Sequence, residues 1–286
     1  MSTAPMSQDD QSARPIGVFD SGVGGLTVLR ELVARLPHEA YVYLGDTARL
    51  PYGTKSPKTI MQYAAQMARV LVHHHIKLLV VACNTATAAA LPYLKELFPD
   101  LPIVGVIEPG AQAAVSVTKK NKVLLLATET TVHSGIYQAA IHSLNPKIEV
   151  YAQSCGLLVP FAEEGLVEEE ITTSILKKYL EPMLQQADWP DCVILGCTHF
   201  PVFKKMMTAL LGQTIHIVDS AKETAQVVFQ TLQSLGLQKH KGSTTIQFLV
   251  TDLPERFHRI GKIFFGQALD SEKIQLIDAA SLDQRD

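Results

Sequence analysis

The stretch "VVACNTATAAA" (residues 80–90) passes from β-branched apolar residues to an alanine-rich segment. Its first residues are typical of the end of a buried strand, and its alanines are typical of a helix. Cys83 therefore lies where a strand passes into a helix. The stretch "VILGCTHFPVF" (residues 193–203) repeats this arrangement around Cys197. Two thiols at equivalent junctions indicate a repeated strand–helix plan.

Short apolar runs alternate with longer segments along the whole chain. The runs are rich in β-branched residues and leucine and have no polar alternation, which is typical of strands covered on both faces. They are Ile16–Phe19, Val42–Leu44, Leu78–Ala82, Ile103–Val106, Val123–Leu126, Ile148–Tyr151, Val193–Leu195, Ile215–Val218 and Ile246–Val250. This alternation predicts an α/β fold with mainly parallel sheets.

Helical spacing of apolar residues fills the segments between these runs. It is clearest over residues 60–71, 171–183 and 225–232. Ser220 with Glu223 three residues later is typical of a capping box, so we expect Ser220 to cap the helix that follows.

Ligands of open α/β sheets collect at the carboxyl ends of the strands. Cys83 and Cys197 both lie at such ends, and so do Asp20 and Asp46. The two cysteines are 114 residues apart, and the junctions at Asp20 and Thr128 are 108 apart. This similarity suggests two halves of one plan, with a cleft that receives one thiol from each.

The composition limits the class of protein. The chain has 286 residues, 47% of them apolar and 19% charged, with a net charge of −3, which indicates a globular protein and no nucleic-acid surface. No apolar stretch is long enough for a membrane span, and the polar N-terminus lacks a signal core. Four sparse cysteines indicate free thiols in a reducing cytosol. Residues 1–14 are expected to form a flexible tail.

Three kinds of chemistry use two cysteines. The reducing compartment argues against a disulfide. A zinc site needs further ligands at short spacing, and Cys192, Cys197 and His199 do not form a convincing set. The third is acid–base chemistry, in which a thiolate removes a proton from one face of a carbon and a thiol returns one to the other. A neighbouring His199 or a helix N-terminus would favour the thiolate.

The glycine-rich stretch "FDSGVGGLTVL" (residues 19–29) resembles a nucleotide-binding loop only loosely. Its glycines do not fit G-x-G-x-x-G, and no lysine follows as in a P-loop. Its backbone N–H groups could still hold a carboxylate, since a helix begins directly after it.

Six segments together resemble the glutamate racemases, a cofactor-independent branch of the aspartate/glutamate racemase superfamily. They span nearly the whole chain in the family's order. They are "IGVFDSGVGGLTVL" (16–29), "YLGDTARLPYGTKS" (43–56), "ACNTA" (82–86), "GVIEPGA" (105–111), "VPFAEEG" (159–165) and "LGCTHFP" (195–201).

The resemblance implies two similar, pseudo-twofold-related α/β domains with the active site between them. It implies reversible conversion of L-glutamate to D-glutamate for peptidoglycan, without a cofactor or a metal, by a cytoplasmic homodimer. The domains are expected to comprise residues 15–109 with 220–286, and residues 110–219. A peptidoglycan precursor is a possible activator. The alternatives are an aspartate or other amino-acid racemase of the superfamily, and a protein-binding role that restrains DNA gyrase.

The resemblance also implies roles for individual residues. Cys83 and Cys197 match the two catalytic bases, the first serving D-glutamate and the second L-glutamate. Asp20 and His199 match their polar assistants, and Glu163 matches a further acidic residue of the site. Read without the family, Asp20 could simply cap the following helix, and the role in the site is the favoured interpretation.

Substrate contacts are implied for residues of the same blocks: Asp20, Ser21, Pro51, Tyr52, Gly53, Asn84, Thr85, Thr128, Thr131 and Thr198. The chain departs from the family pattern at three flanking positions. Ala127 stands where glycine is usual, Gly156 where proline often follows the cysteine, and Phe200 where tyrosine is usual. These departures leave substrate fit open, but they remove no catalytic group.

Overall fold

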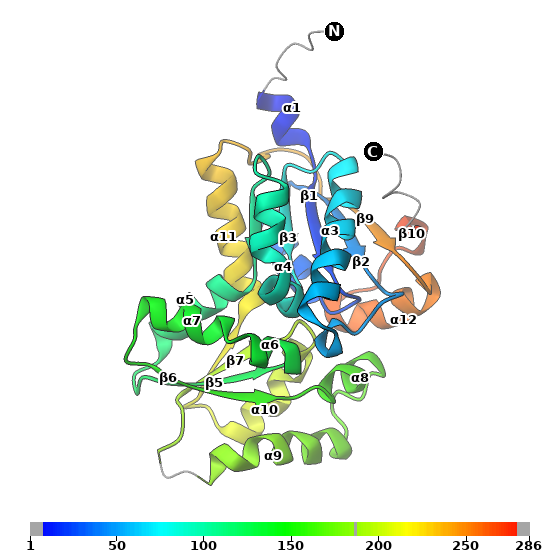
Figure 1. Cartoon of the computed structure of the whole chain (residues 1–286). Helices are drawn as coiled ribbons and strands as arrows, with labels where there is room; N and C mark the ends of the chain where they lie inside the picture. The colour runs from blue at the N-terminus through cyan, green and yellow to red at the C-terminus, as the bar shows by residue number, and fades with distance from the viewer. Residues whose placement is uncertain (1–7, 186–187, 279–286) are drawn as a thin grey trace.

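Two parallel sheets with flanking helices make up the computed structural model, which describes residues 8–185 and 188–278 (Figure 1). One sheet has six strands in the order β10-β9-β2-β1-β3-β4, and the other has four in the order β6-β5-β7-β8. All paired strands run parallel. The predicted α/β class with mainly parallel sheets is confirmed.

All nine expected strands are present. The six-stranded sheet contains β1 (Ile16–Asp20), β2 (Ala40–Gly45), β3 (Leu78–Val81), β4 (Ile103–Gly105), β9 (Thr245–Val250) and β10 (Ile274–Leu276). The four-stranded sheet contains β5 (Lys122–Ala127), β6 (Glu149–Ser154), β7 (Cys192–Gly196) and β8 (His216–Asp219). The sequence did not indicate β10, because it is a three-residue edge strand with little burial.

Helices surround both sheets (Figure 1). With the six-stranded sheet we group, as the first half, α1 (Gln8–Ala13), α2 (Leu26–Arg35), η1 (Tyr52–Thr54), α3 (Pro57–His73), α4 (Asn84–Leu97), α11 (Ser220–Ser234), α12 (Pro254–Phe265) and η3 (Ser271–Lys273). With the four-stranded sheet we group, as the second half, α5 (Ile107–Val117), α6 (Glu129–Ser134), α7 (Ile136–Leu144), α8 (Leu158–Glu163), α9 (Glu170–Leu184), η2 (Phe200–Phe203) and α10 (Lys204–Leu211).

Burial of the central strands on both faces accounts for their unbroken apolar sequences. Every residue of β1 and β7 is buried. Alternate residues of β5 enter different apolar clusters, with Leu124 and Leu126 in one and Val123 and Leu125 in another. Edge strand β6 differs, since none of its residues is buried, so the expectation that every run is covered on both faces is wrong there.

The register of the strands brings the functional loops together. Phe19 of β1 is paired with Val81 of β3, so Asp20 and the loop that carries Cys83 leave the sheet side by side. In the other sheet Ala127 is paired with Gly196, which places Thr128 beside Cys197. Both thiols therefore follow the carboxyl ends of central strands.

Two local expectations need correction. Residues 8–13, expected within a flexible tail, form helix α1, while residues 1–7 lie outside the described part of the chain. Asp219, rather than Ser220, caps α11, because its carboxylate accepts the N–H of Ala221 at 3.0 Å.

The strands of the two sheets come from separate stretches of the chain. Strands of the four-stranded sheet lie within residues 122–219, and the other strands lie before and after them. Helix α11, which begins at the predicted boundary, packs against both α2 and α5. The exact boundaries at residues 110 and 220 stay a prediction.

A buried ion pair ties several segments together at the amino ends of the first-half strands. Lys77 Nζ lies 2.5 Å from Glu39 Oε2, with side-chain exposures of 1% and 0%. The ammonium also donates to the carbonyls of Ser12 and Leu237 at 2.7 and 2.8 Å. A buried charge that loses its partner strongly destabilises a fold.

We expect Glu39→Gln to lower the free energy of unfolding by about 3 kcal/mol, because the Lys77 ammonium stays buried without a countercharge. Urea denaturation checks this. The matched control is Glu168→Gln, which removes an exposed pair with Lys205 and should leave stability unchanged. Equal effects of the two variants would contradict the structural role of the buried pair.

Candidate active site

Cys83 lies between β3 and α4, as the sequence predicts, and is the N-cap of the helix. Its sulfur accepts the N–H of Ala86 at 3.4 Å, and its thiol donates to Ser21 Oγ at 3.4 Å. Burial raises the pKa of the Cys83 thiol to about 12, and the charge of Asp20 adds to the rise. The thiol is therefore neutral at neutral pH.

Cys197 follows β7 in the second half and has a different partner. Its sulfur lies 3.8 Å from Nδ1 of His199, whose Nε2 lies 3.1 Å from Glu163 Oε1. Burial alone would lower the pKa of His199, but its hydrogen bonds to Cys197 and Glu163, with their charges, raise it to about 10. At neutral pH a buried cation therefore lies beside the sulfur of Cys197.

Asp20, the last residue of β1, is fully buried between the thiols' loops. Its carboxylate accepts the Gly22 N–H at 2.9 Å and the Thr198 hydroxyl at 3.4 Å. Burial raises the pKa of Asp20, and the charge of His199 together with backbone N–H groups opposes the rise. The glycine-rich loop thus holds a carboxylate of the chain itself.

Close approach of the halves requires Gly24. A Cβ at this position would lie 2.4 Å from Thr198 Oγ1 and 2.5 Å from His199 Nδ1. Thr27 strengthens the same junction, because its hydroxyl donates to the carbonyl of Thr198 at 3.1 Å.

A fixed loop brings Pro51, Tyr52 and Gly53 to the site. The Tyr52 hydroxyl donates a short hydrogen bond to the buried carboxylate of Asp46. Arg49 and Thr251 bind the same carboxylate. Asp46 therefore holds the loop that carries Tyr52 rather than lining the cavity itself.

Hydroxyl and amide groups from the two halves meet beside Cys83. Thr85 Oγ1 lies 2.9 Å from Thr128 Oγ1 and 3.3 Å from Thr131 Oγ1. The Tyr137 hydroxyl donates to Asn84 Oδ1 at 2.7 Å. Because Oδ1 of Asn84 makes this bond, Nδ2 lies on the other side of the amide group from Tyr137. This buried amide nitrogen has no hydrogen-bond partner in the protein. An unpaired buried donor is costly, so it is suited to receive a polar ligand atom.

These groups surround one small cavity between the halves. Twelve predicted residues line it: Ser21, Pro51, Tyr52, Gly53, Cys83, Asn84, Thr85, Thr128, Glu163, Cys197, Thr198 and His199. Two others do not. Asp20 contacts the lining residue Thr198, and Thr131 contacts Thr85 and Thr128.

The sequence reasoning missed several residues of the site. Gly22, Leu50 and Val159 line the cavity and lie inside the resembling blocks, so their position was the available signal. Tyr137 and Arg256 support lining residues from outside any block, and no sequence signal identified them. Arg256 Nη2 lies 3.4 Å from Glu163 Oε2.

The cavity has a volume of about 20 Å³, which is little more than one water molecule needs. An amino acid is several times larger. The lining of the cavity must therefore move before a substrate of that size can enter.

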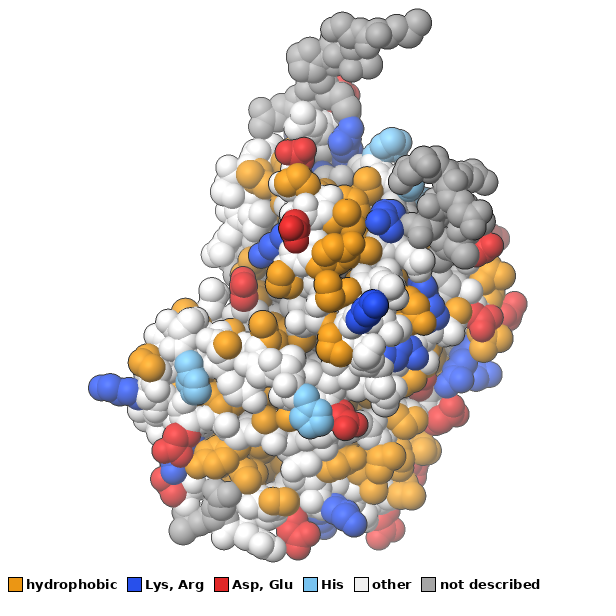
Figure 2. Space-filling view, in the orientation of Figure 1, with side chains coloured by type: hydrophobic (Ala, Val, Ile, Leu, Met, Phe, Trp, Pro, Cys, Tyr) orange, Lys and Arg blue, Asp and Glu red, His pale blue; other side chains and the backbone are white. Residues whose placement is uncertain are grey.

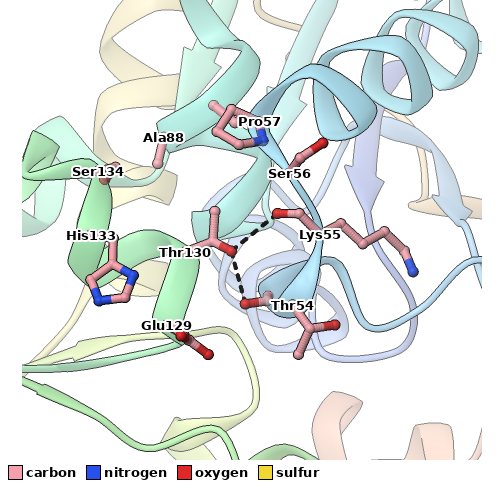
Figure 3. Close-up of a pocket in the computed structure, with 11 residues that line it drawn as sticks. Thr54, Lys55, Ser56, Pro57, Ala88, Glu129, Thr130, His133 and Ser134 are labelled. Atoms are coloured by element: carbon pink, nitrogen blue, oxygen red, sulfur yellow. Dashed lines mark hydrogen bonds between the residues drawn. The ribbon is translucent and has the colours of Figure 1, made fainter.

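A larger pocket of about 520 Å³ adjoins the cavity at Gly53 (Figure 3). Thr130, on α6, reaches across it, and its hydroxyl donates to the carbonyls of Gly53 at 2.8 Å and Lys55 at 3.3 Å. The pocket thus marks a second junction between the halves. On the face shown in Figure 2, acidic and basic side chains are interspersed with hydrophobic and neutral ones.

Residues 8–185 and 188–278 contain neither a metal-binding cluster nor a membrane-spanning helix. No three His, Cys, Asp or Glu side chains in these ranges gather closely enough to hold a metal ion. No helix there has the length and apolar character needed to cross a bilayer. Cys155 and Cys192 are buried and do not line the cavity.

The chain is similar to known racemases over most of its length. Residues 16–228 match the Asp/Glu/Hydantoin racemase family. A glutamate racemase of Geobacter metallireducens is 44% identical over 257 residues, which cover 90% of this chain and 94% of the relative. The chain therefore belongs to the Asp/Glu/Hydantoin racemase family and is an amino-acid racemase.

Solved structures place it more narrowly. A crystal structure of the Francisella tularensis glutamate racemase with D-glutamate has a TM-score of 0.87 and 35% identity, covering 94% of this chain and 99% of that one. The Escherichia coli glutamate racemase with L-glutamate and the activator UDP-MurNAc-ala has a TM-score of 0.71 and 30% identity, covering 88% and 95%. Within its family, the chain groups with the glutamate racemases.

Gly53→Ala should slow racemisation by roughly 100-fold, because a displacement of about 1 Å between reacting groups has effects of that size. The added Cβ would lie 2.7 Å from Thr128 Cβ, in the opposite half. Circular dichroism of glutamate solutions follows the rate. Gly156→Ala is the matched control, since its added Cβ meets nothing within 4 Å. Equal activity of both variants would rule out the need for this close approach.

Stability should fall as the pH rises above neutrality. His199 has a folded-state pKa of about 10 against an ordinary 6.5, so the folded protein binds more protons than the unfolded chain between these values. Its contribution is complete below pH 6.5 and is lost as the pH rises through 10. Urea denaturation at pH 7, 8 and 9 measures the decline, and His199→Asn should flatten it. If the free energy of unfolding of His199→Asn declined with pH as steeply as that of the wild type, groups other than His199 would cause the pH dependence.

Proposed function

We propose that the protein interconverts L-glutamate and D-glutamate by two-base proton transfer at Cα, with Cys83 and Cys197 as the bases. The observation that carries this proposal is the placement of two buried thiols, one from each half, on the wall of one cavity. A planar carbanion between them could be protonated from either side. The similarity to glutamate racemases at more than 40% identity supports the choice of substrate.

In the direction from L-glutamate, the Cys197 thiolate takes the Cα proton and becomes a thiol. The Cys83 thiol then donates its own proton to the opposite face and becomes a thiolate. In the reverse direction the two cysteines exchange roles. The resting arrangement suits the first direction, because the raised pKa of Cys83 keeps its proton in place and the His199 cation lies beside the sulfur of Cys197.

Asp20, Glu163 and His199 would assist these transfers without touching Cα. Asp20 and Glu163 oppose the charge of His199 from two sides, which limits the cost of burying it. As the thiolate at Cys197 is neutralised, the carboxylate of Glu163 still compensates the imidazolium. His199 is thus the assistant of Cys197, while the charge of Asp20 acts on Cys83 and its carboxylate accepts the Thr198 hydroxyl.

Substrate carboxylates would bind the polar groups that ring the cavity. The free Nδ2 of Asn84 and the hydroxyls of Ser21, Thr85, Thr128 and Thr198 are donors of suitable kind. Pro51, Tyr52 and Gly53 would close over the substrate, and Thr131 would orient its neighbouring threonines.

The biological setting is proposed from the same family relationship. D-glutamate would serve peptidoglycan synthesis in the cytoplasm, where four free thiols are stable. A homodimer and activation by a peptidoglycan precursor are proposed by analogy; the Escherichia coli relative was crystallised with such an activator.

Cys83→Ala and Cys197→Ala should each reduce racemisation by about 1000-fold or more, because general acid–base groups contribute effects of this size. The assay uses L-glutamate in D₂O, with NMR of the Cα proton and optical rotation followed together. L-Aspartate is assayed in parallel. Activity on aspartate instead would favour the other branch of the superfamily.

Cys155→Ala is the control for loss of a buried thiol outside the cavity, and it should keep wild-type rates. Full activity in either Cys83→Ala or Cys197→Ala would refute the two-base mechanism. Thermal unfolding of each variant verifies that it is folded.

A further inference from the structure

Helix α12 of the first half contacts the His199–Glu163 pair of the second half at two points. Arg256 Nη2 lies 3.4 Å from Glu163 Oε2 and 3.0 Å from Glu164 Oε1. The ring of Phe264 meets the His199 ring edge-on, with centroids 5.2 Å apart and an interplanar angle of 77°. The pair beside Cys197 is therefore held partly by the opposite half.

The carboxylate of Glu163 is shared between two partners. Oε1 meets His199 Nε2 at 3.1 Å, and Oε2 faces Arg256 at 3.4 Å. The side chain of Glu163 is only 7% exposed, so its orientation is not averaged by solvent. Fixing one oxygen by Arg256 also fixes the plane of the carboxylate, and hence the place where the other oxygen meets the imidazole.

We propose that Arg256 is a positioning residue for the Cys197 half of the reaction. It holds Glu163, Glu163 holds His199, and His199 presents Nδ1 to the sulfur of Cys197. This inference rests on the proposed two-thiol racemisation. Since Arg256 and Glu163 belong to different halves, the chain of contacts is complete only when the halves lie together, so the arrangement couples closure to orientation of one base.

The proposal predicts an asymmetric effect. Cys83 interacts with Ser21, Ala86 and Asp20, and none of these contacts Arg256. Loss of Arg256 should therefore slow removal of the Cα proton from L-glutamate by Cys197 and leave its removal from D-glutamate by Cys83 unaffected. A primary deuterium isotope effect in each direction reports the two steps separately.

The test compares Arg256→Gln, which removes the charge, with Arg256→Lys, which keeps it. Arg259→Gln is the matched control, because Arg259 is an exposed arginine on the same helix, three residues further on. For each protein, kcat and KM are measured with both enantiomers, and isotope effects on kcat/KM are measured with L- and D-glutamate deuterated at Cα.

Arg256→Gln should lower kcat about tenfold, raise the isotope effect for L-glutamate and reduce it for D-glutamate. Arg256→Lys should recover most of the rate, and Arg259→Gln should match the wild type. Wild-type kinetics in Arg256→Gln, or isotope effects that change equally in both directions, would overturn the positioning role. An inactive wild type, or an active Cys197→Ala variant, would instead refute the proposed reaction.

Discussion

Racemisation by two bases requires that both reach one carbon from opposite sides, and a single strand-end loop cannot meet that requirement. In this fold the two thiols follow strands of different sheets. Cys83 comes from β3 of the first half and Cys197 comes just after β7 of the second. Each half supplies one thiol at the carboxyl edge of its sheet, and both thiols line the cavity where the two edges meet.

Enclosure of this site has electrostatic consequences. Burial raises the pKa of Asp20 and of the Cys83 thiol and would lower that of His199. Charge in such a place is tolerated only when it is paired. The imidazolium is paired with Glu163, and Glu163 with Arg256. The asymmetry between the thiols follows, because Cys197 has a cationic neighbour while Cys83 has hydroxyl and backbone neighbours.

Local signals in the sequence were enough for most of the fold. The unbroken apolar runs predicted nine strands because central parallel strands are buried on both faces, as β1 and β7 are. They could not predict β10, whose three residues have no such pattern. The capping residue of α11 was placed one position late, because Asp219 and Ser220 are both good caps and only the backbone decides between them.

Local sequence patterns predicted the candidate site only in part. Strand-end position and the resembling blocks led to the residues that line the cavity. The sequence did not indicate Tyr137 and Arg256, because each acts through a residue of the other half. Tyr137 contacts Asn84, and Arg256 contacts Glu163. Side chains that act through a partner distant in sequence leave no local pattern, and only the packing of the halves reveals them.

The junction between the halves combines polar and apolar contacts. Polar contacts join the halves around the site, among them Thr130–Gly53, Thr85–Thr128, Tyr137–Asn84 and Arg256–Glu163. Each contributes only about 0.5–1.5 kcal/mol, because water replaces it on opening. Apolar side chains of both halves, such as Leu26 and Leu124, also share one buried cluster, so the polar contacts are only part of what holds the junction. The Arg256–Glu163 contact belongs to this junction, so the surroundings of Cys197 depend on how the two halves lie together.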